Sequence, residues 1–247
     1  MKKYVYTIYL AGYPVKYRFL FDDTRYYFGL KAKPDNNNDA DLSMTQEYFQ
    51  ECRRILGDSD PDAYVEYKGL ISMTSQYLLR YSCCIFHAVS LIYKGYTWLL
   101  AGPSGTGKTT QYLNWKSMYP DEISMLCGDM PVLKKKDKKL IYVHPSPWNG
   151  KEDIGSNHTA PLGGIIFLKQ GKVNHIESLS LHDSIVPVFK QFRCIKETQE
   201  DIAKLSEITE SILLNYPVWK FTNLGNFEST GMIRDYINQY YKQRGIL

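Results

Sequence analysis

One short segment of this chain has the residue types and spacing of a loop that binds phosphate groups. It fits the pattern G-x-x-x-x-G-K-[ST], in which small residues let backbone N–H groups turn inward around an anion. Lys108 would place its charge against the β- and γ-phosphates of a nucleotide, and the Thr109 hydroxyl would bind Mg²⁺. The residues of this phosphate-loop motif, all predicted to bind the nucleotide, are Gly102, Pro103, Ser104, Gly105, Thr106, Gly107, Lys108, Thr109 and Thr110.

The sequence on both sides of the motif suits this chemistry. The apolar, β-prone run 97–101 predicts a buried strand before the loop. Tyr112, Leu113 and Trp115 lie within one helical turn after it, which predicts a one-sided helix whose positive end faces the phosphates. The alternative is a glycine-rich turn that binds nothing.

Two residues outside the motif are candidates for the same chemistry. Asp129 follows the short apolar strand predicted at 123–127, where a carboxylate can hold Mg²⁺ beside a nucleotide. The alternative is an ordinary turn aspartate, since Gly-Asp before Met-Pro is typical of turns. His87 lies inside the β-prone run 85–91, where a hydrogen-bonded core histidine competes with a catalytic one.

A loop at 146–153 combines an aromatic residue, a lysine and two carboxylates between backbone-directing Pro and Gly. Mixed loops of this kind often line functional sites, although an ordinary surface loop remains the alternative. Lys151 could neutralise charge on a transferred phosphoryl group, and Glu152 or Asp153 could bind metal or accept a proton.

Composition excludes several other classes of protein. The 247 residues contain no apolar run of 18, and the N-terminus lacks a signal-peptide pattern, so we expect a cytoplasmic protein without a membrane partner. The five cysteines lack metal-ligand spacing. The lysine-rich run 134–139 lies between two β-like runs, so it predicts a solvated hairpin turn better than a nucleic-acid patch.

The elements that must position these residues follow from hydrophobic periodicity. In the first third, alternation predicts a β-hairpin from strands at 4–10 and 15–21. Helices are predicted at 43–56, ending at Gly57, and at 70–81. Beyond residue 81 further strands are predicted at 84–93, 131–133, 140–143, 162–169 and 218–222. The chain after residue 169 is otherwise predicted to be mostly helical, with a terminal helix at 228–243.

These residues together resemble the catalytic domain of the bacterial HPr kinase/phosphorylase family. His87 precedes Gly102 by 15 positions, the spacing of that family, and 94–96 falls where its hairpin turn falls. Asp129 falls at the second position of its Asp-Asp pair. The loop 104–110 is also similar to that of phosphoenolpyruvate carboxykinase, whose nucleotide-binding core has a related fold. The resemblance covers about residues 80–170 and does not extend to the first third of the chain.

The resemblance implies a fold and a set of partners. The fold expected is α/β, with a mixed-sheet core of the HPr kinase/phosphoenolpyruvate carboxykinase type at 81–247. Outside the resemblance, no clear linker follows the N-terminal α+β segment at 1–80, so we expect this segment to pack on the core and, in a kinase, to recognise the acceptor. ATP or GTP and Mg²⁺ would bind, and because the HPr kinase family is hexameric, a homo-oligomer is also among the expectations.

One departure from the family bears on catalysis. Gly128 stands where the family has the aspartate that acts as the base on the acceptor hydroxyl. Losing a general base removes about 10²–10⁴ of rate, unless Asp129, His87 or a carboxylate of the 146–153 loop replaces it. We therefore expect a kinase that phosphorylates a hydroxyl on a protein, a peptide or a small molecule. The alternative is a nucleotide-binding regulatory or scaffolding module with impaired catalysis.

Overall fold

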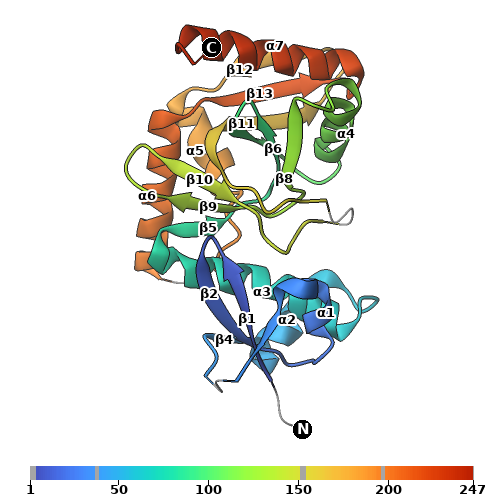
Figure 1. Cartoon of the computed structure of the whole chain (residues 1–247), viewed down its shortest axis with the longest axis vertical. Coiled ribbons are helices and arrows are strands. Elements are labelled where there is room, and N and C mark those ends of the chain that lie inside the picture. The colour runs from blue at the N-terminus through green and yellow to red at the C-terminus, as the bar shows by residue number, and fades with distance from the viewer. Residues whose placement is uncertain (1–3, 37–38, 151–153, 196–197, 247) are drawn as a thin grey trace.

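Two separate β-sheets organise the chain, and helices pack against both of them (Figure 1). The computed structural model describes residues 4–36, 39–150, 154–195 and 198–246. Both sheets contain parallel and antiparallel pairs, so the predicted α/β class with mixed sheets is confirmed. None of the described helices is both long and apolar enough to cross a membrane.

The larger sheet carries the phosphate-loop motif. Its described strands run in the order β5-β9-β10-β11-β7-β6-β8, and β13 pairs with both β11 and β12. Strands β7, β11 and β13 are parallel, whereas β6 is antiparallel to both β7 and β8. The strands are β5 (Cys83–Ile85), β6 (Ala88–Tyr93), β7 (Tyr96–Ala101), β8 (Ile123–Cys127), β9 (Val132–Lys135), β10 (Ile141–His144), β11 (Ala160–Gln170), β12 (His175–Ser178) and β13 (Val218–Asn223).

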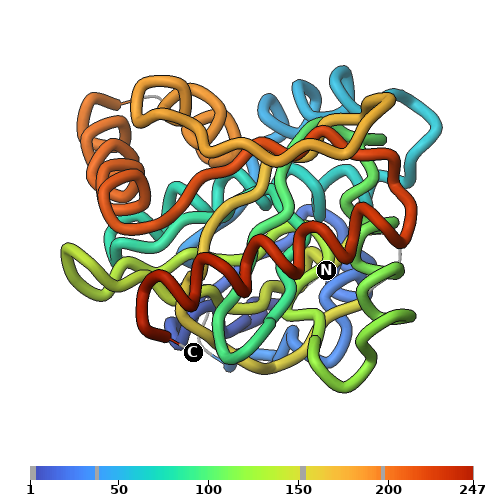
Figure 2. The backbone as a smooth tube through the Cα atoms, turned by 90° about the horizontal axis from the view of Figure 1, so that it is seen from above, coloured from blue at the N-terminus to red at the C-terminus, as the bar shows by residue number. Residues whose placement is uncertain are grey.

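Helices bury both faces of this sheet. On one face α4 (Lys108–Met118) and α7 (Phe227–Gln243) share an apolar cluster with β6, β7 and β13. On the other face α5 (Leu181–Phe189) and α6 (Gln199–Asn215) form a second cluster. Figure 2 shows α7 crossing over the strands. Burial on both faces explains why β7 and β11 are apolar at nearly every position.

The smaller sheet belongs to the N-terminal part of the chain. Its order is β3-β1-β2-β4, and its core consists mainly of aromatic and aliphatic side chains from the strands and from the helices beside them. The elements are β1 (Val5–Leu10), β2 (Tyr13–Arg18), α1 (Thr24–Phe28), β3 (Lys33–Asp35), β4 (Leu42–Ser43), α2 (Gln46–Leu56) and α3 (Asp62–Leu78), with short 3-10 helices at Gly29–Lys31 and Leu79–Tyr81.

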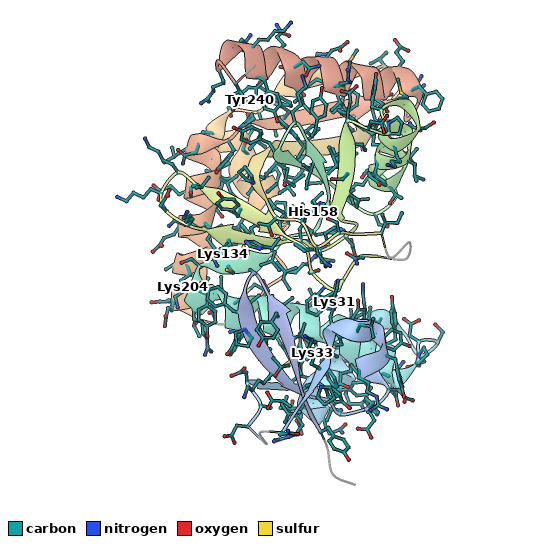
Figure 3. All side chains as sticks on the ribbon, in the orientation of Figure 1. Lys31, Lys33, Lys134, His158, Lys204 and Tyr240 are labelled. Atoms are coloured by element: carbon teal, nitrogen blue, oxygen red, sulfur yellow. The ribbon has the colours of Figure 1, made fainter. Side chains whose placement is uncertain are left out.

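The N-terminal elements pack directly on the segment that follows β10. Tyr67 of α3 donates its hydroxyl to the Pro147 carbonyl at 2.9 Å, and Trp148 returns an indole hydrogen bond to the Tyr67 carbonyl at 3.0 Å. We call this pair of hydrogen bonds the α3–Trp148 contact. Lys31, which points towards the larger sheet in Figure 3, donates to the Ser146 carbonyl at 3.2 Å. Trp148 itself is buried in the N-terminal core.

Most predicted elements are present. The N-terminal hairpin, the strand before the phosphate-loop motif, the helix after it and the terminal helix all form at the predicted places. Helix α2 ends at Gly57, whose φ of 95° suits a residue without a Cβ. The lysine-rich run contributes to the β9–β10 hairpin, where the Asp137 carboxylate accepts hydrogen bonds from the backbone of Lys139 and Leu140.

Three sequence predictions were wrong in detail. Helix α3 begins at Asp62 rather than near residue 70, because buried polar residues such as Glu66 and Thr74 obscure its apolar period. The strand predicted at 84–93 is two strands, since the chain changes partner from β9 to β7 and β8 around His87. The region after residue 170 contains β12, which was expected to be helical.

A buried carboxylate holds the N-terminal elements in place. Glu66 of α3 is fully buried and accepts hydrogen bonds from the backbone of Leu20 and Phe21 at 2.7 and 3.1 Å. The Thr24 hydroxyl donates to the same carboxylate at 2.6 Å. Because a buried charge is tolerated only with such partners, Glu66 fixes the turn between β2 and α1 against α3.

We expect Glu66→Ala to lower the free energy of unfolding by about 3 kcal/mol, because it leaves three donors without their acceptor. Glu66→Gln keeps one acceptor oxygen and should lose less. Urea unfolding measures both, with the exposed Glu210→Ala on α6 as the control. A loss below about 1 kcal/mol for Glu66→Ala would contradict this role.

Candidate functional site

Three strand ends meet at one edge of the larger sheet. Strands β7 and β8 both end there, and β6, antiparallel to each, begins there. The phosphate-loop motif follows β7, Asp129 follows β8, and His87 precedes β6. The Ala88 N–H donates to the Asp129 carbonyl at 2.9 Å, which ties the two strand ends together. The sheet topology thus collects residues that are up to 42 positions apart in the chain.

Glycines shape the turn of the phosphate-loop motif. Gly102, Gly105 and Gly107 have φ angles of 139°, 80° and 93°, a region that L side chains rarely adopt. A Cβ on Gly102 would also lie 2.9 Å from the Leu168 carbonyl oxygen of β11. The loop therefore takes a backbone path that glycine permits, and α4 begins directly after it at Lys108.

Lys108 lies folded back on its own loop. Its ammonium donates to the carbonyls of Gly102 at 2.9 Å and Pro103 at 3.0 Å. Gln170, at the end of β11, braces the loop through a 2.9 Å hydrogen bond to the Gly105 carbonyl. Burial lowers the pKa of Lys108 below its ordinary value, although the nearby Asp129 carboxylate opposes that shift.

Asp129, His87 and Arg193 form a hydrogen-bonded chain. Arg193 Nη2 lies 2.6 Å from His87 Nδ1, and His87 Nε2 lies 3.3 Å from Asp129 Oδ1. Because a guanidinium group can only donate, Nδ1 accepts and Nε2 carries the hydrogen that faces Asp129. Arg193 thereby sets the tautomer of His87 and aims it at the carboxylate.

The Asp129 carboxyl group is held in its charged form. Burial by itself would raise its pKa, but the hydrogen bond from His87 and the positive charges of Lys68 and Lys108 outweigh burial. The pKa of Asp129 is therefore lower than usual. An ionised carboxylate can bind a cation, and the two lysines beside it can bind anionic groups such as phosphate.

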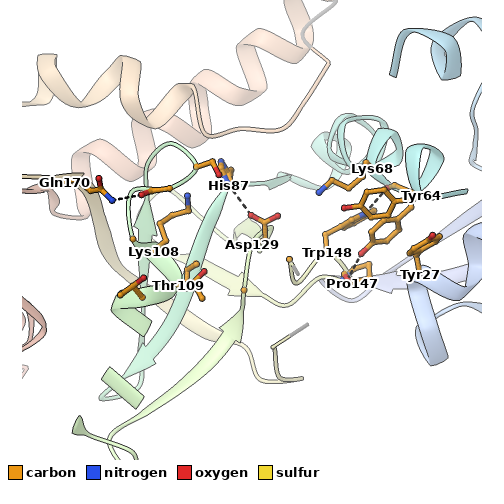
Figure 4. A pocket seen from close by; sticks show the side chains of 18 of the residues that line it. Tyr27, Tyr64, Lys68, His87, Lys108, Thr109, Asp129, Pro147, Trp148 and Gln170 are labelled. Atoms are coloured by element: carbon orange, nitrogen blue, oxygen red, sulfur yellow. Dashed lines mark hydrogen bonds and ion pairs between the residues drawn. The ribbon is translucent and has the colours of Figure 1, made fainter. Parts of the chain in front are cut away.

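One cavity of about 850 Å³ joins the edge of the larger sheet to the N-terminal helices. Six of the nine residues of the phosphate-loop motif line it, together with His87, Gly128 and Asp129. Figure 4 shows Lys108 and Lys68 approaching Asp129 from opposite sides, with an aromatic wall beyond Lys68. That wall consists of Tyr26, Tyr27, Tyr64, Tyr67 and Trp148.

Some of the site residues predicted from the sequence line the cavity, and others do not. His87, Lys108, Thr109 and Asp129 line the same cavity, whereas Gly102, Pro103 and Thr106 belong to the loop without lining it. Lys151 and Glu152, the other two predicted catalytic residues, lie outside the described residues, as does Asp153.

Sequence reasoning missed the aromatic wall and three polar residues around the cavity. Lys68 and Gln170 line it, and Arg193 supports His87 from behind. No local sequence pattern marks any of these three residues. Each lies on an element that is distant from the phosphate-loop motif in the sequence, and folding brings it there. The abundance of tyrosine in the N-terminal segment was the available signal for the aromatic wall.

Gly128 has a structural reason in this chain. A Cβ at this position would collide with the Asn149 backbone oxygen and would lie 3.1 Å from the Ile154 backbone oxygen. The backbone at Asn149 and Ile154 therefore fills the space that a side chain would need, and the bridge from Cys127 to Gly155 holds Ile154 near this position. An aspartate at position 128 could not stand beside Asp129 unless the backbone at Asn149 and Ile154 moved.

The donor set fits a metal bound together with phosphate better than a metal bound by protein alone. Within the described ranges, no group of three or more His, Cys, Asp and Glu could hold a metal ion. Mg²⁺ usually keeps several waters and takes one or two protein ligands plus substrate phosphates. Thr109 and Asp129 in one cavity satisfy that pattern.

Comparison with models of known protein families gave no match, and comparison with curated proteins gave none either.

We expect Gly128→Ala to displace the backbone at Asn149 and to lower the free energy of unfolding by about 1–3 kcal/mol, because the new methyl group overlaps that backbone. Chemical unfolding measures this. Gly231→Ala on α7 is the control, since its Cβ would have 3.9 Å to its nearest neighbour and should be neutral or stabilising. Equal stability of Gly128→Ala and the parent protein would show that the loop yields freely.

Proposed function

We propose that this chain binds a nucleoside triphosphate, ATP or GTP, with Mg²⁺ and transfers its γ-phosphoryl group to a hydroxyl. The observation that carries the proposal is the convergence of Lys108, Thr109, Asp129 and His87 on one cavity at the edge of the larger sheet. The resemblance to the HPr kinase and phosphoenolpyruvate carboxykinase cores supports it. In the HPr kinase family a phosphate loop precedes a strand that ends in paired aspartates, and Asp129 falls at the second position of that pair.

In this proposal the phosphate-loop motif holds the β- and γ-phosphates. The backbone N–H groups of such a glycine-rich loop and the N-terminus of α4 favour an anion. Lys108 exchanges its two carbonyl partners for phosphate oxygens, which is a small movement for a flexible lysine. Bound Mg²⁺ would neutralise charge on the β- and γ-phosphates, and Thr109 and Asp129 are the residues that would hold it.

The transfer step needs little covalent help from the protein. The bond between the γ-phosphorus and the bridging oxygen to the β-phosphate breaks, a bond from the acceptor oxygen to phosphorus forms, and the nucleoside diphosphate leaves. The acceptor proton passes to the Asp129 carboxylate. His87 donates to that carboxylate through Nε2, so it orients Asp129 and does not accept the proton itself. The low pKa of Asp129 makes it a weak base, which suits a loose transition state.

A second function from another class stays open, that of a nucleotide-binding regulatory or scaffolding module. The filled space at Gly128 favours it, because the family's base cannot be accommodated there. Labelled ATP, supplied with Mg²⁺ and with sets of hydroxyl-bearing peptides and metabolites, separates the two functions. A phosphorylated product forms only with a kinase, and nucleotide binding without any product indicates the module.

We expect Lys108→Ala to weaken the binding of magnesium–ATP by about ten- to a hundredfold, because one charge-assisted contact to phosphate is lost. Isothermal titration measures the change, and GTP is titrated in parallel. Lys116→Ala on the same helix is the control, because Lys116 is exposed and, among the described residues, donates a hydrogen bond to the Pro120 carbonyl alone. Unchanged affinity in Lys108→Ala would refute the nucleotide site.

Asp129→Asn should remove most of the benefit that Mg²⁺ gives to ATP binding, because an amide is a weaker ligand for this cation than a carboxylate. The measurement compares ATP affinity with and without Mg²⁺ in parent and variant. Asp121→Asn, an exposed change after α4, should leave the Mg²⁺ effect intact. If Asp129→Asn keeps the full effect, Asp129 is not on the metal side.

A further inference from the structure

Lys68 is a cation aimed into the cavity from the N-terminal part of the chain. It lies on α3, lines the cavity, and faces Asp129 from the side opposite Lys108 (Figure 4). The two lysines differ in their local partners. Lys108 donates to two loop carbonyls, whereas none of the described residues accepts a hydrogen bond from Lys68. Its charge is therefore available to a ligand.

The neighbours of Lys68 hold its helix firmly. Glu66 clamps the β2–α1 turn, and Tyr67 makes the α3–Trp148 contact. Gly69, at the next position, packs so closely against α2 and the residues before it that a Cβ would lie 2.7 Å from Met44 Cε and 2.8 Å from Cys52 Sγ. With one residue anchored on each side, the backbone of Lys68 is pre-positioned at the cavity, a property that helps a residue act on a reacting group.

The order of residues along the cavity indicates what Lys68 would meet. Lys108 and Thr109 mark the β- and γ-phosphates, and Asp129 marks the metal side next to the γ-phosphate. Lys68 lies beyond Asp129, between it and the aromatic wall (Figure 4). The γ-phosphoryl group would therefore leave the nucleotide in the direction of Lys68, and the acceptor would enter from the wall.

We propose that Lys68 binds the γ-phosphoryl group during its transfer, so that the N-terminal segment completes the catalytic site of the core. This inference rests on the proposed function. The phosphoryl group carries charge on its three equatorial oxygens while it moves between two oxygens, and a cation on the acceptor side stabilises that charge. Lys108 contacts it from the nucleotide side. Lys68 then stabilises the transition state of transfer more than it stabilises the bound nucleotide.

A planar phosphoryl mimic tests this without knowledge of the acceptor. Magnesium–ADP is titrated alone and together with aluminium fluoride, which occupies the γ-position as a flat anion. The variants are Lys68→Met, which keeps the aliphatic stem, and Lys68→Arg, which keeps the charge. We expect Lys68→Met to bind magnesium–ADP like the parent and the fluoride complex about ten- to a hundredfold more weakly. Lys68→Arg should recover part of the loss.

Two controls separate this inference from the proposed function. Lys33→Met, an exposed change in the same segment, should alter neither affinity. Thermal unfolding confirms that each variant is folded. If the parent binds neither ligand, the proposed function itself fails. If the parent binds both and Lys68→Met retains the parent's preference for the fluoride complex, Lys68 only pairs with Asp129 and the inference is overturned. Equal weakening of both ligands in Lys68→Met overturns it as well.

Discussion

The α3–Trp148 contact is the interaction on which the arrangement of the cavity depends. Two hydrogen bonds in opposite directions join Tyr67 to the segment that holds Pro147 and Trp148. One consequence is that α3 faces the edge of the larger sheet, which brings Lys68 to Asp129. The other is that the backbone after Trp148 is pressed against Gly128. A single packing contact thus determines both where the Lys68 cation lies and why position 128 of the candidate site has no room for a side chain.

The electrostatics of the cavity follow from that geometry. Asp129 is partly buried, but one hydrogen bond and two lysines more than compensate, so the carboxylate stays ionised. Arg193 fixes the orientation of His87 without entering the cavity. The candidate site is therefore organised around one negative group with cations on both sides. Such an arrangement favours the binding of a metal and of phosphate together.

The fold gives a physical reason for the glycine at position 128. Gly128 is required by the close approach of the Asn149 backbone, which leaves no room for a side chain at this position. Phosphoryl transfer depends mostly on positioning and on neutralising charge, and it tolerates a weak base better than acyl or proton transfer does. The proposal of a kinase with Asp129 as proton acceptor rests on this tolerance of phosphoryl transfer for a weak base.

The sequence alone determined the features that depend on local spacing. The phosphate-loop motif, its flanking strand and helix, and the place of Asp129 after β8 follow from short-range periodicity and glycine positions, because these patterns act within one or two turns of chain. Only the tertiary structure decided which distant residues meet them. No local sequence pattern marks Lys68, Arg193 or Gln170. The buried polar residues Glu66 and Thr74 also interrupt the apolar periodicity by which α3 could be predicted. Their positions come from how the N-terminal helices pack on the sheet edge, which no local pattern encodes.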